Sequence, residues 1–440
     1  MDLTKQAIDI FQAALAAVQP AQLIGEQLRL VNGQLCIGEQ RFELGRGKIY
    51  VIGAGKASAH MARALEGVLG EHIAAGLVTV KYGHRVPCRR VSIREAGHPL
   101  TDRAALEATA VILAMLQQCT AEDLVICLLS GGGSALLEQL PGEISLEALQ
   151  ETMRQLLACG ATIHEINAVR KHLSRVKGGQ LAQAVAPARC LSLIISDVIG
   201  DDLDVIASGP TAPDSSSFAD ALAVLEKYHL TENIPAAVLR HLRRGEAGKA
   251  AETGKPGDPV FAKVENIILG NNRRALAQAE AAAQRADYRT LVLSSRIQGE
   301  AREVAKVLAA VVQEIAASGQ PLSRPAALLF GGETTVTVRG KGKGGRNQEL
   351  ALAALLALEG LEAPYAFLSG GTDGTDGPTD AAGAVFGPAI WEQIRAKQFD
   401  PRAFLADNDA YHFFEPAGGL LKTGPTGTNV MDIGIVLLPG

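Results

Sequence analysis

The stretch that decides the fold is LVICLL at 124–129, followed directly by SGGGS at 130–134. Six apolar residues in a row with a turn behind them are typical of a strand that is buried on both faces of a sheet. A helix is expected to begin near Ser134, after the glycines. The stretch therefore predicts one strand, loop and helix repeat of an α/β fold.

The same pattern recurs along most of the chain, with helical patterns at 57–69, 274–285 and 299–317 between the apolar runs. This alternation predicts two α/β domains with mostly parallel sheets, of which the N-terminal one is Rossmann-like. Ligands of such sheets bind beyond the carboxyl ends of the strands, where several glycine loops fall. The other predicted strands are 48–52, 77–81, 91–96, 191–195, 267–269, 290–293, 327–330, 334–339, 365–368 and 432–438.

The length of 440 residues exceeds what one compact core usually holds, so two domains are expected. Around 240–260 the sequence becomes rich in Gly, Pro and charges, without periodicity. We therefore predict a domain over 1–240, a linker or long loop over 241–260, and a second domain over 261–440.

The composition points to a cytoplasmic protein. The net charge is −5, with dispersed Lys and Arg, which argues against nucleic acid as a partner. No apolar run is long enough to span a membrane. Residues 1–19 predict an amphipathic helix, and Asp2 and Asp9 argue against a signal peptide. The cysteines contain no Cys-x-x-Cys pair and are expected to be reduced; they are Cys36, Cys88, Cys119, Cys127, Cys159 and Cys190.

The loop after the 48–52 strand resembles a dinucleotide fingerprint in part. Gly53 and Gly55 fit the pattern, but Ser58 stands where its third glycine is expected. A tight turn with a solvated Lys56 is the plain alternative. Because Lys56 falls at the start of the next helix, where the helix dipole disfavours a cation, we expect it to share its site with an anion. Gly55 is a candidate phosphate-binding residue.

The SGGGS loop is the stronger phosphate candidate. Consecutive glycines cost backbone entropy, and their use is close approach and a concavity of N–H groups that binds anions. A plain capped turn is the alternative. Ser134 does not fit a nucleophile elbow, because Leu136 stands where the last glycine of Gly-x-Ser-x-Gly belongs. The candidates are Ser130, Gly131, Gly132, Gly133 and Ser134.

Residues 167–179 form the most basic stretch, in which Arg170, Ser174 and Lys177 would share one helical face. Such a run usually forms a solvated face, and we expect a structural role. Lys171 and Arg175 are the candidates to reach a cleft. The histidines are scattered, form no metal cluster with the cysteines, and receive no role.

Acidic residues follow two predicted strands. Asp197 ends the 191–195 run, and Asp373 and Asp376 follow the 365–368 run. A carboxylate there could bind Mg²⁺ or accept a hydroxyl proton, with turn capping as the alternative. The residues do not decide which of Asp197 and Asp373 would act as base or metal ligand, and Asp376 is a further metal candidate.

A second basic glycine loop lies at 341–347. Positive charge beside free N–H groups suits polyphosphate, although no Walker A or protein-kinase motif is present. Arg346 falls at a helix start, which again suggests a nearby anion. The phosphate candidates here are Glu333, Lys341, Lys343, Gly345 and Asn347.

Taken together, the motifs resemble the glycerate 2-kinase family, whose C-terminal part is the MOFRL domain. Each motif alone would say little, but seven in order over nearly the whole chain are specific. They are VIGAGKA (51–57), LSGGGSA (129–135), NAVRKHLS (167–174), SDVIGD (196–201), GGETTV (331–336), GGRNQE (344–349) and GGTDGTDG (370–377).

The resemblance implies ATP- and Mg²⁺-dependent phosphorylation of D-glycerate to 2-phosphoglycerate, in a cleft between two α/β domains. It also implies that Lys56 and Arg346 are the active-site cations. Asp197 and Asp373 remain candidates for the catalytic base. Two alternatives stay open: an NAD(P)H-dependent hydroxypyruvate reductase, and a non-catalytic regulator that binds nucleotides or sugar acids. The oligomeric state is also open, a homodimer included.

Overall fold

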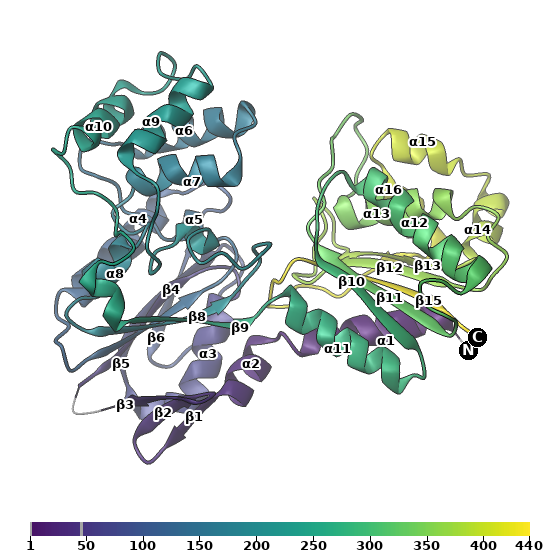
Figure 1. Ribbon diagram of the computed structural model, residues 1–440, viewed down its shortest axis with the longest axis horizontal. Helices are drawn as coiled ribbons and strands as arrows, with labels where there is room; N and C mark the ends of the chain where they lie inside the picture. Colours follow the sequence, from purple (N-terminus) through teal and green to yellow (C-terminus); the bar gives the residue numbers. More distant parts are fainter. Residues whose placement is uncertain (1, 45–46) are drawn as a thin grey trace. The chain divides into compact units, whose positions relative to one another are not determined.

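The computed structural model describes residues 2–44 and 47–440 and divides into two compact units (Figure 1). The first unit comprises 23–269, and the second comprises 1–22 together with 270–440. This division differs from the one predicted from the sequence, in which the boundary fell at 241–260. Met1, at the start of the predicted helix 1–19, lies outside the described residues.

The first unit is built on a six-stranded sheet in the order β6-β5-β4-β7-β8-β9. The strands β6, β5, β4, β7 and β8 pair in parallel with one another in this order, which confirms the predicted mostly parallel sheet. Counted along the chain, this is the strand order of the Rossmann fold, and it reverses between β4 and β7. The bounds are β4 (Ile49–Ala54), β5 (Ile73–Lys81), β6 (Val91–Ala96), β7 (Leu124–Leu129), β8 (Arg189–Ile195) and β9 (Val264–Gly270).

Helices cover both faces of this sheet. Helix α3 (Ser58–Leu69) buries Met61 and Leu65, four residues apart, against one face, where it contacts β4, β5 and β7. Helices α4 (Arg103–Leu116) and α8 (Gln180–Val185) pack together and contact the sheet on the other side (Figure 1). Short turns of helix occur at α5 (Gly133–Leu136), η1 (Gly70–His72), η2 (Ile206–Ser208) and η3 (Pro259–Lys263).

The first unit also carries two parts that the sequence did not predict. A small antiparallel sheet of β1 (Leu28–Val31), β2 (Gln34–Ile37) and β3 (Gln40–Glu43) follows α2 (Pro20–Gln27). Its first turn contains Asn32 and Gly33, both with positive φ, as tight hairpin turns require. A separate helical layer with its own apolar core consists of α6 (Leu146–Ala158), α7 (Ile163–His172), α9 (Phe218–Lys227) and α10 (Ala236–Glu246).

The second unit contains a mixed six-stranded sheet in the order β10-β11-β15-β12-β13-β14. Among the described strands of this sheet, only β10 and β11 pair in parallel, because β15 returns antiparallel between β11 and β12. The predicted strand over 334–339 is wrong: the segment holds a single bridge from Thr335 to Glu300. The bounds are β10 (Arg289–Ile297), β11 (Ala326–Gly332), β12 (Ala366–Gly371), β13 (Gly383–Phe386), β14 (Leu420–Leu421) and β15 (Asp432–Leu438).

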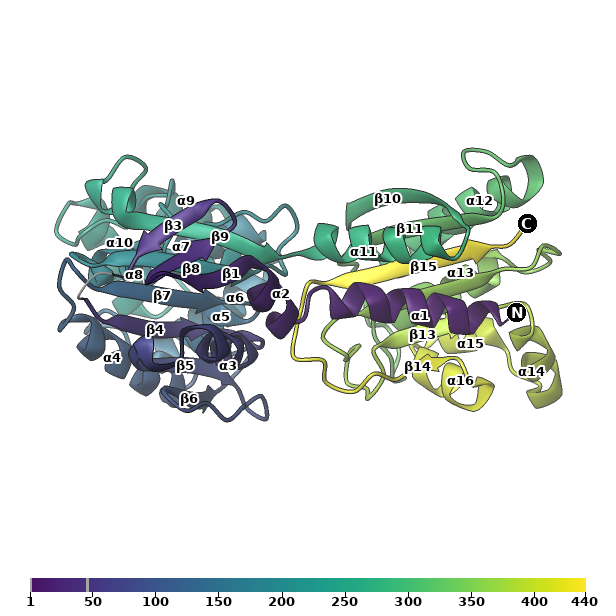
Figure 2. The ribbon, with the colours of Figure 1, turned by 90° about the horizontal axis from the view of Figure 1, so that it is seen from below.

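This sheet lies between two helical layers (Figure 2). Helices α1 (Leu3–Ala16) and α11 (Asn272–Arg285) pack on one face, and α12 (Ala301–Ser318) and α13 (Arg346–Ala357) on the other. Helix α13 is buried on all sides from Asn347 to Leu355, as expected of a central helix. The remaining helices are α14 (Ile390–Lys397), α15 (Pro401–Ala406) and α16 (Ala410–Ala417).

Packing explains why the unit boundaries differ from the prediction. Helix α1 buries Ile10 and Phe11 against the second sheet, so the N-terminal segment joins the C-terminal part of the chain. The stretch predicted as a linker begins inside α10 and is tied to the first unit, where Asp214 donates its N–H to the Gly254 carbonyl at 2.7 Å. Strand β9 then completes the first sheet.

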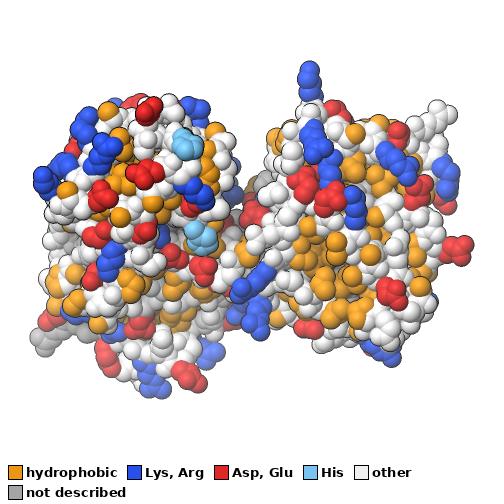
Figure 3. Space-filling view, turned by 45° about the horizontal axis from the view of Figure 1, so that its top comes forward, with side chains coloured by type: hydrophobic (Ala, Val, Ile, Leu, Met, Phe, Trp, Pro, Cys, Tyr) orange, Lys and Arg blue, Asp and Glu red, His pale blue; other side chains and the backbone are white. Residues whose placement is uncertain are grey.

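Charged side chains of both signs occur on the surface (Figure 3), and the cysteines form no disulfide. On the face drawn in Figure 3, basic and acidic side chains are interspersed. All six cysteines are unpaired. Among the described residues no single helix is long and apolar enough to cross a membrane. The bent pair α1 and α2 reaches that length and composition together, but α1 packs on the second sheet.

Candidate active site

The loops after β4 and β7 interlock where the strand order reverses. The Lys56 N–H donates to the Gly131 carbonyl at 2.8 Å, and the Ser130 N–H donates to the Ala54 carbonyl at 3.2 Å. A Cβ at Gly55 would lie 2.2 Å from the Ser130 hydroxyl, and Gly55 has a φ of +141°. Glycine is therefore required at this contact. The crossing places the two predicted loops side by side at the usual ligand position of this fold.

The buried Ser130 side chain stabilises the contact between the two loops. Its buried hydroxyl accepts the N–H of Ala57 at 3.0 Å and lies 3.0 Å from the Ser58 hydroxyl, which donates to the Leu128 carbonyl. The structure thus gives Ser130 a capping contact at the start of α3, and explains why serine is accommodated at 58, where a dinucleotide fingerprint has glycine. Lys56 stands directly before Ala57, the N-cap of α3.

A cavity of about 210 Å³ opens beside the SGGGS loop. His98 lies over Gly132, because a Cβ there would be 2.8 Å from the imidazole Cδ2 and 3.6 Å from the Cγ of Lys56. Burial, followed by the charges of Lys56, Lys81 and His84, lowers the pKa of His98 to about 4. The imidazole is therefore neutral at neutral pH. The polar side chains around the cavity are those of His98, Thr101, Ser134, Glu138, Gln150 and Arg170.

A chain of hydrogen bonds runs along one wall of this cavity. The hydroxyls of Ser134 and Ser208 lie 2.9 Å apart, Ser208 donates to Asn167 Oδ1 at 3.0 Å, and Arg170 Nη1 donates to the same oxygen at 3.0 Å. Ala207 and Ser208 have φ values of 51° and 62°. Left-handed backbone in residues other than glycine costs about 1–3 kcal/mol per residue and is concentrated at functional sites. The strained turn makes this wall a candidate ligand-binding surface.

The basic stretch 167–179 does not form the single helical face that was predicted for it. Helix α7 ends at His172, so Ser174 and Lys177 do not continue one helical face with Arg170. Lys177 is fully buried, and its Nζ lies 2.8 Å from Glu138 Oε2. The two side chains form a structural ion pair, so Lys177 is not a solvated charge. Lys171 is also buried, with its Nζ 3.2 Å from Asp214 and 3.0 Å from Asp204, and Arg175 is exposed. Arg170 is the basic residue of this stretch that lines the 210 Å³ cavity.

In the second unit, Arg346 is held by two carboxylates at the start of α13. Its Nε and Nη2 bind Asp432 at 2.6 and 2.9 Å, and its Nη1 lies 2.7 Å from Glu333. Burial opposes the charged form, but Asp432 and Glu333 outweigh it and raise the pKa of Arg346. The structure thus pairs two of the predicted site residues, Arg346 and Glu333, with each other.

Asp376 caps helix α13. Its Oδ1 accepts the Asn347 N–H at 3.1 Å and its Oδ2 the Gln348 N–H at 2.9 Å. The fit needs Gly345, where a Cβ would come within 2.3 Å of the carboxyl carbon. Burial raises the pKa of Asp376 to about 6. Asn347 in turn accepts a hydrogen bond from the Ser369 hydroxyl at 2.6 Å. Both Asp376 oxygens are thus engaged in fixing the helix.

The basic loop before α13 is fixed by aspartates on the segment between α15 and α16. The N–H of Lys341 donates to Asp407 at 3.0 Å and that of Lys343 to Asp409 at 2.7 Å. The ammonium group of Lys343 lies 4.2 Å from the centre of the Tyr411 ring. Two of the N–H groups that could have met phosphate are therefore bound to carboxylates.

The two candidate carboxylates lie on different units. Asp197 follows β8 of the first unit. Asp373 follows β12 of the second, where its Oδ1 accepts from the N–H and hydroxyl of Thr375 at 3.0 and 3.1 Å. Within residues 2–44 and 47–440, no group of three or more His, Cys, Asp or Glu side chains could hold a metal by itself.

Sequence reasoning missed four residues of these sites. His98 and Arg170 were given no ligand role, and Ser208 and Asp432 were not singled out for the site. Ser208 precedes the Gly209-Pro210 turn, which is a signal for a tight conformation, and Asp432 begins a strand with a carboxylate. Their partners are far away in sequence, so spacing alone does not reveal them.

The fold and these sites define a two-unit α/β protein whose charged side chains gather around glycine loops. A family model described as a domain of unknown function (DUF4147) matches residues 6–243, and the MOFRL family model matches 326–432. The chain belongs to the glycerate 2-kinase family, which combines these two parts.

Full-length relatives agree with this assignment. The chain is 41% identical to a glycerate 2-kinase of Pyrococcus horikoshii, covering 100% of this chain and 98% of the relative. It is 42% identical to a D-glycerate 2-kinase of Thermotoga maritima, with 99% and 98% covered. The crystal structure of a glycerate kinase from T. maritima superimposes with a TM-score of 0.88 at 42% identity, covering 99% of both chains.

Proposed function

We propose that this protein is a glycerate kinase that transfers the γ-phosphoryl group of ATP to the 2-hydroxyl of D-glycerate, giving 2-phosphoglycerate and ADP. The observation that best supports this proposal is the 210 Å³ cavity, which is lined by Arg170 and Ser134 and lies next to the Lys56 loop. Membership of the glycerate 2-kinase family supports the reaction class.

The cavity suits a three-carbon hydroxy acid in size and chemistry. Arg170 offers a guanidinium that can bind a carboxylate through two N–H groups, and the Ser134 hydroxyl can bind a substrate hydroxyl. Because His98 is neutral at neutral pH, it can accept or donate one hydrogen bond without adding charge. We assign this cavity to glycerate.

Transfer of the phosphoryl group needs positive charge where the negative charge develops. Lys56, beside the cavity, and Arg346, oriented by Asp432, are the two cations assigned to this role. The N–H groups of Gly131 and Gly132 would contact phosphate oxygens, whereas that of Gly133 donates to the Ser130 carbonyl at 3.2 Å. Lys56 belongs to the first unit and Arg346 to the second, so the proposal assigns one cation to each unit.

Magnesium fits the donor set because it prefers oxygen ligands and is usually held by one or two carboxylates plus substrate phosphates. Asp197 and Asp373 are the residues proposed to hold it, and one of them would alternatively accept the proton of the substrate hydroxyl. Asp376 suits this role less, because both its oxygens bind the start of α13. A bound Mg²⁺ would neutralise phosphate charge.

A nicotinamide-dependent hydroxypyruvate reductase has weaker support. Dinucleotide-binding folds of this strand order place an acidic residue near the end of the second strand, where it binds the ribose hydroxyls. Here that strand is β5, which ends at Lys81. The third glycine of the fingerprint is also replaced by buried Ser58.

The test is to incubate the purified protein with ATP, Mg²⁺ and D-glycerate and to identify the phosphoglycerate by NMR. We expect 2-phosphoglycerate and an equal amount of ADP. A product phosphorylated at the 3-position would overturn the regiochemistry. Oxidation of NADH with hydroxypyruvate, without ADP release from glycerate, would favour the reductase instead. Ligand binding without any turnover would favour the regulator.

A further inference from the structure

A second cavity, of about 290 Å³, lies in the first unit at the C-terminal end of α7 and is separate from the one assigned to glycerate. Basic groups dominate its charged side chains: Glu143 is the acidic residue of the lining, which has no residue in common with the first cavity. The basic residues are His172, Arg175, His241, Arg244 and Lys249.

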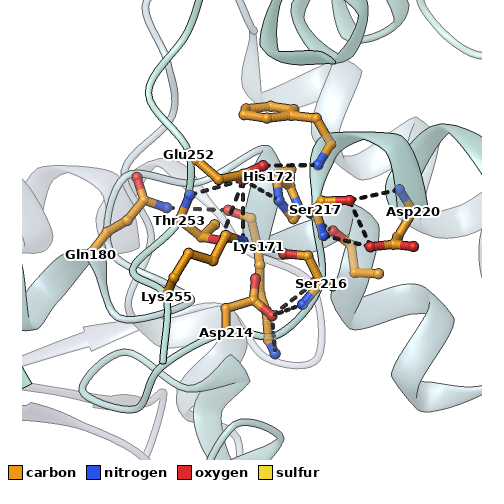
Figure 4. A network of polar contacts seen from close by, with 12 residues as sticks. Lys171, His172, Gln180, Asp214, Ser216, Ser217, Asp220, Glu252, Thr253 and Lys255 are labelled. Carbon is orange, nitrogen blue, oxygen red and sulfur yellow. Dashed lines mark hydrogen bonds and ion pairs between the residues drawn. The ribbon is translucent and has the colours of Figure 1, made fainter. Parts of the chain in front are cut away.

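Both ring nitrogens of His172 and of His241 lie within hydrogen-bond distance of an oxygen atom. His172 has its Nδ1 2.6 Å from the Ala168 carbonyl and its Nε2 2.7 Å from a Glu252 oxygen (Figure 4). His241 has its Nδ1 2.8 Å from a Glu143 oxygen and its Nε2 3.0 Å from the His172 carbonyl. These contacts on both sides fix the orientation of each ring in the cavity wall.

The lining of the cavity has more basic than acidic side chains. Glu143 is shared between His241 and Arg244, whose Nη1 lies 2.6 Å from it, and Glu252 lies between His172 and Lys255. Neither Arg175 nor Lys249 forms an ion pair with the described residues. The lining therefore sets the cationic side chains of Arg175, Arg244 and Lys249 against the carboxylate of Glu143, which favours an anion.

The wall of the cavity formed by His172, Phe218 and His241 is rigid. Buried His172 stacks edge-on against Phe218, with ring centres 4.6 Å apart, and Phe218 packs against His241 at 5.8 Å. Next to it, buried Lys171 binds Asp214, which accepts two further bonds from Ser216 (Figure 4). A wall fixed in this way keeps its shape without a ligand, so binding an anion beside it costs little reorganisation.

We propose that this cavity is a second anion site, which binds a small ligand with two or more negative charges, such as a phosphate or a phosphorylated small acid. Lys249 and Arg175 would contact the anion directly, because no carboxylate of the described residues competes for them. Arg244 would add positive charge, and His172 and His241 would form the fixed wall beside the anion. This assignment goes beyond the kinase reaction and does not depend on it.

The experiment is calorimetric titration of the full chain with inorganic phosphate, pyrophosphate and 2-phosphoglycerate in separate runs. The variants are Arg175→Gln and Lys249→Gln. The matched control is Arg240→Gln, which removes an exposed cation from α10, the helix that carries Arg244, without changing the cavity lining. Circular dichroism checks that all the variants fold.

We expect one binding event to weaken about tenfold or more in each variant, as the loss of one charged hydrogen bond predicts, and to be unchanged in Arg240→Gln. Binding of inorganic phosphate would identify free phosphate as sufficient, whereas binding of 2-phosphoglycerate alone would identify an organic phosphate. Isotherms of Arg175→Gln and Lys249→Gln that superimpose on the wild type for all three probes would overturn the proposal, since the proposed glycerate cavity is untouched in both variants.

Discussion

Arg346 and Asp432 form a two-pronged ion pair, with Nε 2.6 Å from Oδ2 and Nη2 2.9 Å from Oδ1. The pair joins the first residue of α13 to the first residue of β15, which are 86 positions apart in the sequence. A guanidinium held along one edge has a fixed plane and direction. Asp432 is therefore the residue that orients the second proposed cation.

Replacement of Arg346 should impair turnover more than folding. We expect Arg346→Ala to lower kcat about 10²–10³-fold, as the loss of a preorganised charge donor does. Arg346→Lys should recover little, because an ammonium cannot make the two-pronged contact. The matched control is Arg402→Ala, whose ion pair with Glu359 is exposed. Steady-state ADP release gives kcat, and near-normal turnover of Arg346→Ala would contradict the assigned role.

Replacement of Lys56, in the first unit, should lower turnover as replacement of Arg346 does. We expect Lys56→Ala to lower kcat about 10²–10³-fold while the protein remains folded, since its side chain is proposed to meet phosphate. Lys48→Ala removes an exposed lysine just before β4 and should change kcat less than twofold. A Lys56→Ala enzyme as active as Lys48→Ala would refute the assignment.

Arg170 should control glycerate binding. Arg170→Gln loses the charge that is proposed to meet the substrate carboxylate, so KM for D-glycerate should rise about tenfold to a hundredfold, with a smaller effect on KM for ATP. Arg154→Gln is the control, because the Arg154 side chain is exposed on α6 and does not line the cavity. Initial rates with each substrate varied separately distinguish the two constants. Equal changes in both would argue against a glycerate cavity at Arg170.

Gly55→Ala should destabilise the crossing of the two loops. Its new Cβ would meet the backbone and hydroxyl of Ser130 within 2.5 Å, at a φ of +141°. We expect a loss of about 2–3 kcal/mol in the free energy of unfolding. Gly67→Ala is the control, because nothing lies within 4 Å of its new Cβ on α3, and it should stabilise by about 0.5–1 kcal/mol. Urea unfolding followed by circular dichroism compares the two, and equal stabilities would contradict the contact.

The contribution of Asp376 to the stability of the second unit should decrease as pH rises. Its pKa is about 6 when folded, against 3.8 in a free aspartate. Between these values the folded state binds more protons than the unfolded state, so its contribution to stability falls from about pH 4 to pH 6. The upper bound of this loss is about 3 kcal/mol.

Asp376→Asn provides the measurement because asparagine does not titrate. The stability of the wild type minus that of the variant should decrease from pH 4 to pH 6, and this difference cancels the other titrating groups. Trp391, the single tryptophan, lies in the second unit, so its fluorescence reports the unfolding of that unit. A pH-independent difference would show that Asp376 does not titrate in this range.

Much of the fold could be predicted from local pattern. The predicted strands 91–96, 124–129 and 432–438 have the bounds of β6, β7 and β15, because a short, continuous apolar run flanked by turns is typical of a buried strand. The hairpins of β1 to β3 were missed, since their short strands are half exposed and polar. The direction of β15 was also missed: a run that is buried on both faces looks the same in either orientation.

Glycine spacing and strand ends indicated Lys56, the SGGGS loop and Arg346 as candidates, and their roles stay predictions. The sequence placed Arg170 in a basic run, where an arginine beside a cavity cannot be told from a solvated one. Only the folded chain shows that Lys177 is buried against Glu138, while Arg170 lines the cavity with Ser134.

By itself the sequence determined the family and the α/β class and indicated the loops proposed to carry the chemistry, because these depend on residues close together in the chain. The tertiary structure decided which side chains meet. It paired Arg346 with Asp432, bound Asp376 to the start of α13, and gathered the basic residues of the second cavity from α7, α10 and the segments that follow them. Such contacts join positions tens of residues apart, and they depend on strand order and direction, which a one-dimensional pattern does not specify.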